Sequence, residues 1–149
     1  MRGFWLFVHY IGFTLWLGAG IGTMIAGITA KRFPPAERLA AYRLTGAVQR
    51  LLVGPGAVGV VVSGVVLSMS WMRSGDLPGW LMLKITAGIV GALIALGLSV
   101  PTAARLGMLE LDPRGELPEA FARLRKRQIW TATIAGSLGL IALGAAALR

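Results

Sequence analysis

The stretch GFWLFVHYIGFTLWLGAGIG, residues 3–22, decides the fold class of this chain. It lies within a run from Phe4 to Ala30 that contains no acidic residue, lysine or arginine. A transmembrane helix needs about 20 apolar residues, so this run is long enough to span a bilayer. It also exceeds the roughly 7–15 apolar residues of a signal peptide, and Lys31 and Arg32 follow it. We therefore interpret it as a retained membrane helix.

Three further blocks resemble the first in length and composition, and Lys84 is the one charged residue inside them. Helices are expected because lipid cannot satisfy free backbone groups and no segment alternates as a barrel strand does. The sequence therefore predicts an all-α fold, an integral membrane four-helix bundle formed by one transmembrane domain (residues 1–149). The expected helices cover about 4–30, 51–72, 79–101 and 128–148.

The positive charge of the chain, +9 over 149 residues, gathers in two connecting segments. Its members are Lys31, Arg32, Arg38, Arg43 and Arg50 in the first segment and Arg105, Arg114, Arg123, Arg125, Lys126 and Arg127 in the second. The remaining short connection, next to Asp76, holds only Arg73. This bias predicts two cytoplasmic loops, with both termini outside a bacterial cytoplasmic (inner) membrane. It favours the lipid bilayer, including its anionic lipids, over nucleic acid as the partner.

Prolines mark the expected ends of several helical segments. Pro34 and Pro35, followed by Glu37, predict the start of an amphipathic helix on the cytoplasmic surface at about 35–50. The Gly-Pro-Gly sequence at 54–56 is expected to break or kink the chain before the second membrane helix. Pro101 predicts the inner end of the third.

Small residues spaced four apart predict where the helices pack closely. The sets are Gly18 and Gly22, Ala87 with Gly91 and Ala95, Ala132 and Gly136, and Ala135 and Gly139. Ala103, nearer the end of its helix, is expected to tolerate a larger side chain. The tryptophans Trp5, Trp71 and Trp80 are expected at the outer membrane boundary.

A weak internal repeat relates the two halves of the chain. WLFVHYIG (5–12) and WLMLKITAG (80–88) share Trp-Leu-x-x-[His/Lys], and their tryptophans lie 75 residues apart. Short matches between apolar segments also arise by chance. Two parallel helix-pair repeats are therefore one hypothesis for the bundle.

The candidate functional site consists of His9, the only histidine, and Lys84. With a rise of about 1.5 Å per residue, both lie roughly 7–8 Å below the outer boundary. At about 100° per residue, His9 shares a stripe with Trp16, Gly20, Thr23 and Gly27, and Lys84 shares one with Gly88, Gly91 and Ala95. These faces should point inward, so we expect a shared pocket that opens toward the outer leaflet. The alternatives are a Lys84 that extends to the interface and a His9 that only bonds a neighbouring helix.

Imidazole is a good ligand for haem iron or copper. A methionine could provide a second ligand, and Met69, Met72 and Met82 lie near the outer end, although such methionines more often serve packing. Without cysteine the chain has no disulfide or thiolate metal site. With no Ser-His-Asp set and with Asp and Glu confined to loops, hydrolysis and a carboxylate proton relay have no support.

A family resemblance rests on Phe7-Val8-His9, Trp16, Glu37-Arg38, Pro55, Gly64, Gly79-Trp80 and Lys84. With these short motifs, the first two-thirds of the chain resembles the HemJ-type protoporphyrinogen oxidase superfamily, which includes CopD-like copper-resistance membrane domains. The resemblance implies that His9 binds haem and that Lys84 is functional. Under it we expect His9, Trp16 and Lys84 to contact haem b or another tetrapyrrole, with Lys84 catalytic in a HemJ-like oxidoreductase.

Three functions stay open at this point. The first is haem or tetrapyrrole binding for redox work. The second is a CopD-like copper-handling protein that uses His9 with Met69, Met72 and Met82. The third is a non-enzymatic membrane subunit that docks to a partner complex or forms a homo-oligomer, which small-residue faces left over after internal packing would favour.

Overall fold

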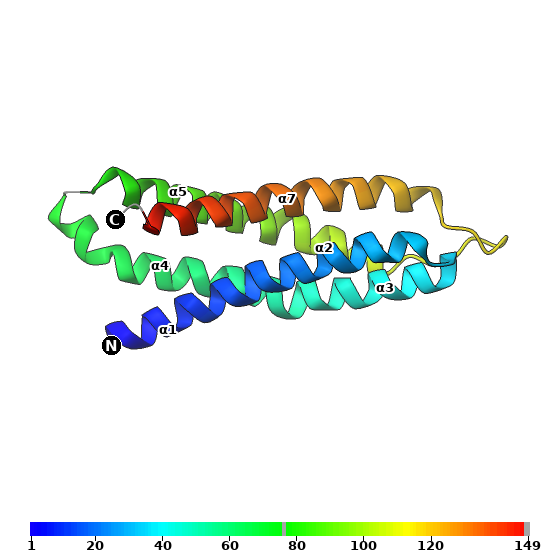
Figure 1. Ribbon diagram of the computed structural model, residues 1–149, viewed down its shortest axis with the longest axis horizontal. Helices are drawn as coiled ribbons and strands as arrows, with labels where there is room; N and C mark the ends of the chain where they lie inside the picture. The colour runs from blue at the N-terminus through cyan, green and yellow to red at the C-terminus, as the bar shows by residue number, and fades with distance from the viewer. Residues whose placement is uncertain (76, 148–149) are drawn as a thin grey trace.

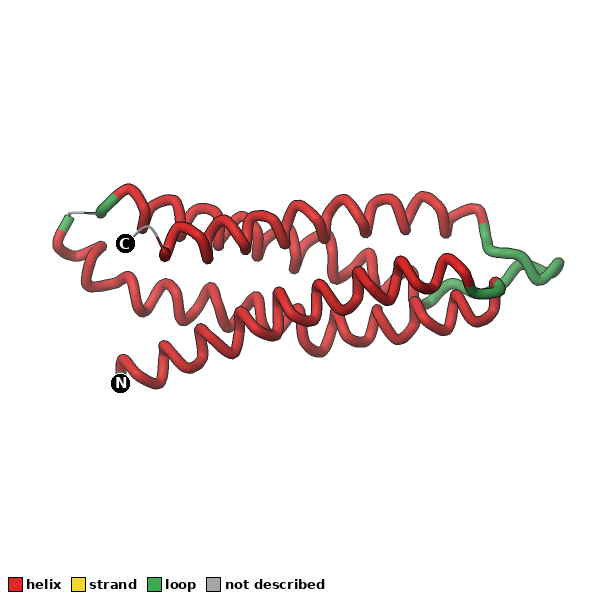
Figure 2. Tube along the Cα trace, in the orientation of Figure 1, coloured by secondary structure: helices red, strands yellow, loops and turns green. Residues whose placement is uncertain are grey.

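The computed structural model describes residues 1–75 and 77–147, and helices dominate this part of the chain (Figures 1 and 2). Four helices are long and apolar enough to cross a membrane: Arg2–Arg32, Pro35–Ser74, Gly79–Gly107 and Glu119–Ala147. The predicted all-α four-helix bundle is confirmed. The helices extend beyond the apolar blocks because the basic segments between the blocks are largely helical as well.

Each of the first three spans is divided into shorter elements. The first holds α1 (Arg2–Phe13), a π-helical turn (Thr14–Gly18), α2 (Ala19–Thr29) and a 3-10 turn (Ala30–Arg32). The second holds α3 (Pro35–Val48), a π-helical turn (Gln49–Val53) and α4 (Gly54–Ser74). The third holds α5 (Gly79–Ile94), a π-helical turn (Ala95–Ser99) and α6 (Val100–Gly107), and the fourth is the continuous α7 (Glu119–Ala147).

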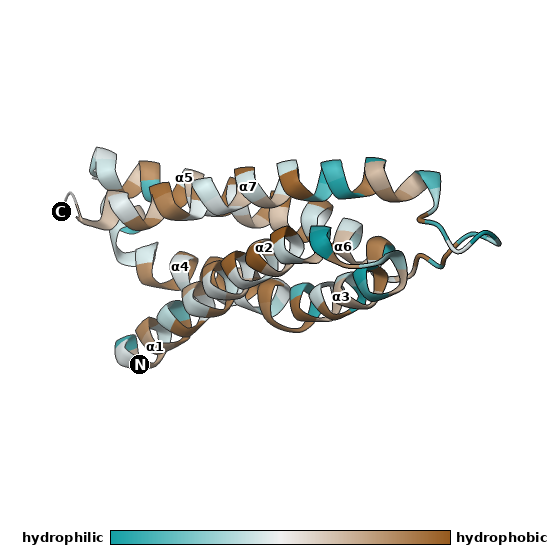
Figure 3. Cartoon of the chain, turned by 45° about the vertical axis from the view of Figure 1, so that its right-hand side comes forward, coloured by the Kyte–Doolittle hydropathy of each residue, from teal (hydrophilic) through white to brown (hydrophobic). Residues whose placement is uncertain are grey.

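The two ends of the bundle differ in character. At one end, here the terminal end, α1 begins, α7 stops and the chain turns between α4 and α5 (Figure 1). At the other, here the basic end, lie the turn between α2 and α3 and the loop 108–118, where hydrophilic residues gather (Figure 3). The spans alternate in direction, so both polar connections at the basic end lie on one side of the apolar middle.

The bundle is built from two closely packed pairs. α1 packs chiefly on α4 and α5 on α7, while α3 packs on α6 toward the basic end. Gly12 and Gly56 allow the first pair to approach, because a Cβ added to Gly56 would lie 2.8 Å from the Gly12 carbonyl oxygen and 2.8 Å from the Trp16 backbone nitrogen. This contact holds α1 directly against α4 one turn from His9.

Two expectations about helix ends were wrong. The helix predicted to start at Pro35 is present as α3, but it forms no separate surface helix, since it continues into α4. Pro101 lies inside the third span. A proline within a helix removes one hydrogen bond and collides with the preceding turn. A π-helical turn ends two residues before each proline, at Val53 before Pro55 and at Ser99 before Pro101. The wider turn accommodates the ring, and the helix goes on.

The small-residue prediction holds for Ala87, Gly91 and Ala95 on α5 and for Ala135 and Gly139 on α7, but not for the other two sets. A Cβ on Gly91 would meet Leu138 Cβ at 3.0 Å and the Trp16 ring at 3.1 Å, so this face is internal as predicted. Around Gly18, Gly22 and Gly136, by contrast, the described residues place no atom within 4 Å of an added Cβ. Ala103 is buried, and its carbonyl oxygen lies 2.8 Å from a Cβ added to Gly46. The expected tolerance at Ala103 was therefore wrong, because α3 packs on it.

The core consists mainly of small side chains. One cluster in the middle of the bundle surrounds Phe13 and Trp16 and contains many alanines, and a second at the basic end contains Leu39, Tyr42, Leu106 and Phe121. Side-chain hydrogen bonds also join different spans. Among them, Gln49 Nε2 donates to Thr23 Oγ1 (2.9 Å), and Gln128 Nε2 donates to Ser99 Oγ (3.1 Å).

Candidate functional site

His9 lies on the inner face of α1 and is 7% exposed. Its Nδ1 atom lies 2.9 Å from the hydroxyl oxygen of Ser63 on α4, which is fully buried. The Ser63 hydroxyl in turn donates to the Gly59 carbonyl oxygen at 2.5 Å. Because a carbonyl can only accept and the hydroxyl carries one proton, His9 Nδ1 must be the donor to Ser63 Oγ. The neutral ring therefore keeps its unshared electron pair on Nε2.

Glycine and aromatic neighbours fix the position of the imidazole. A Cβ on Gly64 would lie 3.3 Å from His9 Cε1, so the ring packs closely against the α4 backbone. On its own helix, the Phe13 ring meets the imidazole edge to face at 5.2 Å, and Trp16 stacks on Phe13 at 6.0 Å. The ring is held by packing as well as by its hydrogen bond.

The Nε2 atom is buried, and the described residues give it no hydrogen-bond partner. A buried polar atom without a partner is costly, which makes it a candidate ligand atom. The ring lines a cavity of about 130 Å³ toward the terminal end of the bundle. The cavity lies where α1, α4, α5 and α7 meet, and its other polar lining residues are Ser68 and Lys84.

The structure brings His9 and Lys84 together. Both line this cavity, His9 from α1 and Lys84 from α5. The cavity is otherwise lined mainly by aliphatic side chains, together with Phe13 and Met72. The cavity is therefore a small apolar space whose lining includes the His9 imidazole, with its acceptor atom Nε2, and the Lys84 side chain.

The other predicted site residues lie in different surroundings. Trp16 is buried in the core against Gly91 and Gly139 and does not line the cavity. Met72 lines it, whereas Met69 and Met82 do not, and all three methionines are about half exposed. Within the described residues no three His, Cys, Asp or Glu side chains come together to hold a metal ion. A ligand set here would therefore depend on His9 and Met72.

Sequence reasoning missed Ser63 and Ser68. They are two of the four serines of α4, and both are buried. A serine in a membrane helix usually bonds its own backbone, so its presence alone did not indicate a link to His9. The useful sign was the Ser63-Gly64 pair, where a small polar side chain adjoins a position without a Cβ.

Comparisons of the chain with protein-family models, curated proteins and solved structures found no match.

Proposed function

We propose that this protein is an integral membrane protein of a bacterial cytoplasmic membrane with its basic end in the cytoplasm. The four apolar spans support the bilayer location in general. The orientation rests on the Lys and Arg residues in the segments that form the basic end, since basic loops are retained on the cytoplasmic side. Under this proposal the cavity of His9 and Lys84 opens in the outer half of the membrane.

We further propose that the cavity binds an iron tetrapyrrole of the haem type through His9 Nε2. The observation that carries this is the buried, unpartnered Nε2 on a ring whose Nδ1–H is fixed by Ser63. Metal-bound histidines usually have their second nitrogen held in this way. The resemblance to HemJ-type proteins points to the same residues, His9 and Lys84.

The donor set fits a haem better than a bare metal ion. The porphyrin supplies four ligands to iron, so a single imidazole suffices on the protein side. Lys84 could then pair with a propionate, which would offset the cost of a cation at this depth. A bound haem would supply one-electron chemistry. His9 would hold it, Ser63 would orient His9, and the aliphatic lining would exclude water.

The volume sets a condition on this proposal. Sites for ligands of cofactor size usually measure about 300–1,000 Å³, and the cavity holds about 130 Å³. A whole macrocycle does not fit at the present separation of the helices. Loading would require α4 and α5 to move apart, and these two helices belong to different packed pairs.

A copper site is the second candidate, and Met72 is the observation that favours it. Thioether and imidazole are suitable ligands for copper(I), and Met72 lines the same cavity as His9. A single ion also fits the volume. The charge of Lys84 weighs against this candidate, since a second cation in a small apolar space is unfavourable.

The visible spectrum and metal content of the protein, purified in mild detergent after supply of hemin or copper, test both candidates. A Soret band that His9→Ala abolishes supports the haem proposal, and copper without a Soret band supports the alternative. Tyr10→Phe is the matched control, because Tyr10 is the next residue on α1 and is exposed. A wild-type protein that takes up neither, or a His9→Ala variant that keeps what it bound, overturns the ligand role.

A further inference from the structure

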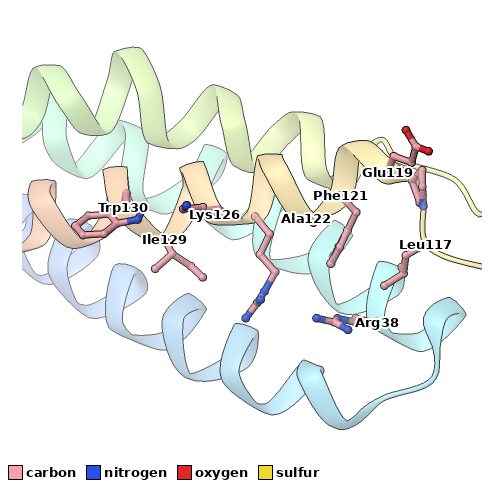
Figure 4. Close-up of a pocket in the computed structure, with 10 residues that line it drawn as sticks. Arg38, Leu117, Glu119, Phe121, Ala122, Lys126, Ile129 and Trp130 are labelled. Atoms are coloured by element: carbon pink, nitrogen blue, oxygen red, sulfur yellow. The ribbon is translucent and has the colours of Figure 1, made fainter.

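A cavity larger than that of His9 lies at the basic end, far from His9. It measures about 560 Å³ and runs between α3 and the first turns of α7 (Figure 4). Three basic side chains line it, Arg38 from α3 with Arg125 and Lys126 from α7. Ile129 and Trp130 continue the lining along α7 toward the middle of the bundle. One groove thus joins a cationic part to an apolar part.

Two of the three cations are held in place by the fold. The Arg38 guanidinium lies 5.0 Å from the centre of the Phe121 ring, and Arg125 Nε donates to the Tyr42 hydroxyl at 2.8 Å. Arg38 Nε is buried, and the described residues offer it no hydrogen-bond partner. Arginines positioned in advance lose little freedom when they bind an oxyanion, and their planar N–H groups match phosphate.

The charge of the groove is unbalanced. Glu119 is the one acidic residue that lines it, and its carboxylate points away from Arg38 in Figure 4. In the described part of the chain, none of the three cations forms an ion pair with a carboxylate. An anion that entered the groove would therefore meet two or three positive groups and displace no existing ion pair.

The position of the groove relative to the membrane indicates what kind of anion it binds. The 29 residues of α7 extend about 43 Å at 1.5 Å per residue, whereas the hydrocarbon core is about 30 Å thick. The first turns of α7 must therefore lie among the lipid headgroups, with Arg125 and Lys126 just outside the apolar segment. Ile129 and Trp130 are 48% and 61% exposed, so they face the acyl chains. Tryptophan is common at this boundary.

We propose that this groove binds one anionic phospholipid. Its phosphate lies among Arg38, Arg125 and Lys126, and an acyl chain lies along Ile129 and Trp130. Because Arg38 belongs to the second span and the other residues to the fourth, the bound lipid bridges the two packed pairs at the basic end. Basic pockets between membrane helices recognise lipid headgroups by this combination of charge and depth. The proposal is independent of what His9 binds.

Thermal unfolding in a neutral detergent tests the proposal. Titration with phosphatidylglycerol should raise the unfolding midpoint, since a ligand that binds only the folded state stabilises it. Phosphatidylcholine and inorganic phosphate should leave the midpoint unchanged. An equal rise with phosphatidylcholine would overturn the role of charge, and an equal rise with inorganic phosphate would overturn the role of the acyl chain.

Lys126→Gln and Arg127→Gln form a matched pair of variants. Both residues are exposed and adjacent on α7, but only Lys126 lines the groove. Lys126→Gln should weaken the apparent affinity for phosphatidylglycerol about 5-fold, the equivalent of about 1 kcal/mol per basic residue at an anionic surface. Arg127→Gln should not. If both variants weaken binding equally, the lipid responds to the general charge of the end and the site is refuted.

Discussion

His9 Nδ1 donates a hydrogen bond to Ser63 Oγ across 2.9 Å, and this bond between two buried side chains joins α1 to α4. Ser63 already donates to the Gly59 carbonyl oxygen, so its hydroxyl serves as acceptor for histidine and donor to its own helix. The bond fixes which ring nitrogen carries the proton. It thereby determines that Nε2 is the atom available to a ligand.

Ser63→Ala should destabilise the protein by about 1–3 kcal/mol, because the buried Nδ1–H of His9 would lose the Ser63 hydroxyl as its acceptor. The midpoint of thermal unfolding in detergent measures this. Ser70→Ala is the control, since Ser70 lies on the same helix and is exposed. If the proposed ligand role is correct, Ser63→Ala should also weaken metal or haem binding about 10–100-fold. Equal stability of the two variants would show that the hydrogen bond contributes little.

Gly56→Ala should be more destabilising than its size suggests. The added Cβ would lie 2.8 Å from Gly12 O and 2.9 Å from Leu15 Cβ, so α1 and α4 would have to separate. We expect a cost of about 1–3 kcal/mol, as for other overpacked sites. Gly22→Ala should be neutral or stabilising. No described atom outside the neighbouring backbone of its own helix lies within 4 Å of the added Cβ, and alanine is up to about 1 kcal/mol more favourable than glycine in a helix. The difference between the two unfolding midpoints tests the packing.

The sequence predicted the number of spans and the meeting of His9 and Lys84, because both follow from properties that each span shows by itself. Length and apolar composition identify a membrane helix, and the spacing of residues gives depth and face. The face of α1 that contacts α4 was not predictable in the same way. Gly12 lies on α1 and Gly56 on α4, so no spacing within one helix indicates that they meet. Only the packed structure shows this contact.

The effect of the prolines on the helices was a second feature that the sequence did not predict. The Gly-Pro-Gly sequence around Pro55 was expected to break or kink the chain and Pro101 to end a helix, and local chemistry supports both expectations. In the structure each follows a π-helical turn, so the helix continues and α3 packs along α6. Packing of Leu39, Tyr42 and Leu106 in one cluster stabilises the continuous arrangement. Such a long-range contribution has no local sequence pattern.

The orientation of the bundle can be tested by cysteine labelling, since the natural sequence contains no cysteine. Ser74, at the terminal end, and Arg114, in the loop 108–118, are both exposed. A membrane-impermeant thiol reagent added to intact cells should modify Ser74→Cys and leave Arg114→Cys unmodified until the membrane is opened. Labelling of Arg114→Cys from outside would show that the orientation is the opposite of the one proposed. If neither Ser74→Cys nor Arg114→Cys is labelled in opened membranes, both sites are covered.

Lys84 offers the sharpest test of what the cavity binds. If its charge serves an anionic group of a tetrapyrrole, Lys84→Met should weaken retention of the chromophore about 10–100-fold, since a hydrogen bond to a charged group contributes about 1.5–3 kcal/mol. Lys84→Arg should largely preserve it, because the charge remains.

Arg73→Met provides the matched control for charge, because Arg73 is exposed at the end of α4 and does not line the cavity. It should retain the chromophore as the wild type does. Loss of chromophore in both variants would indicate an effect of overall charge at the terminal end. If the Lys84→Met variant retains the chromophore, as measured by the Soret absorbance that remains after dilution, Lys84 does not contribute to binding it. In that outcome His9 alone would define the binding site, and the cation would have to be explained by the stability of the bundle.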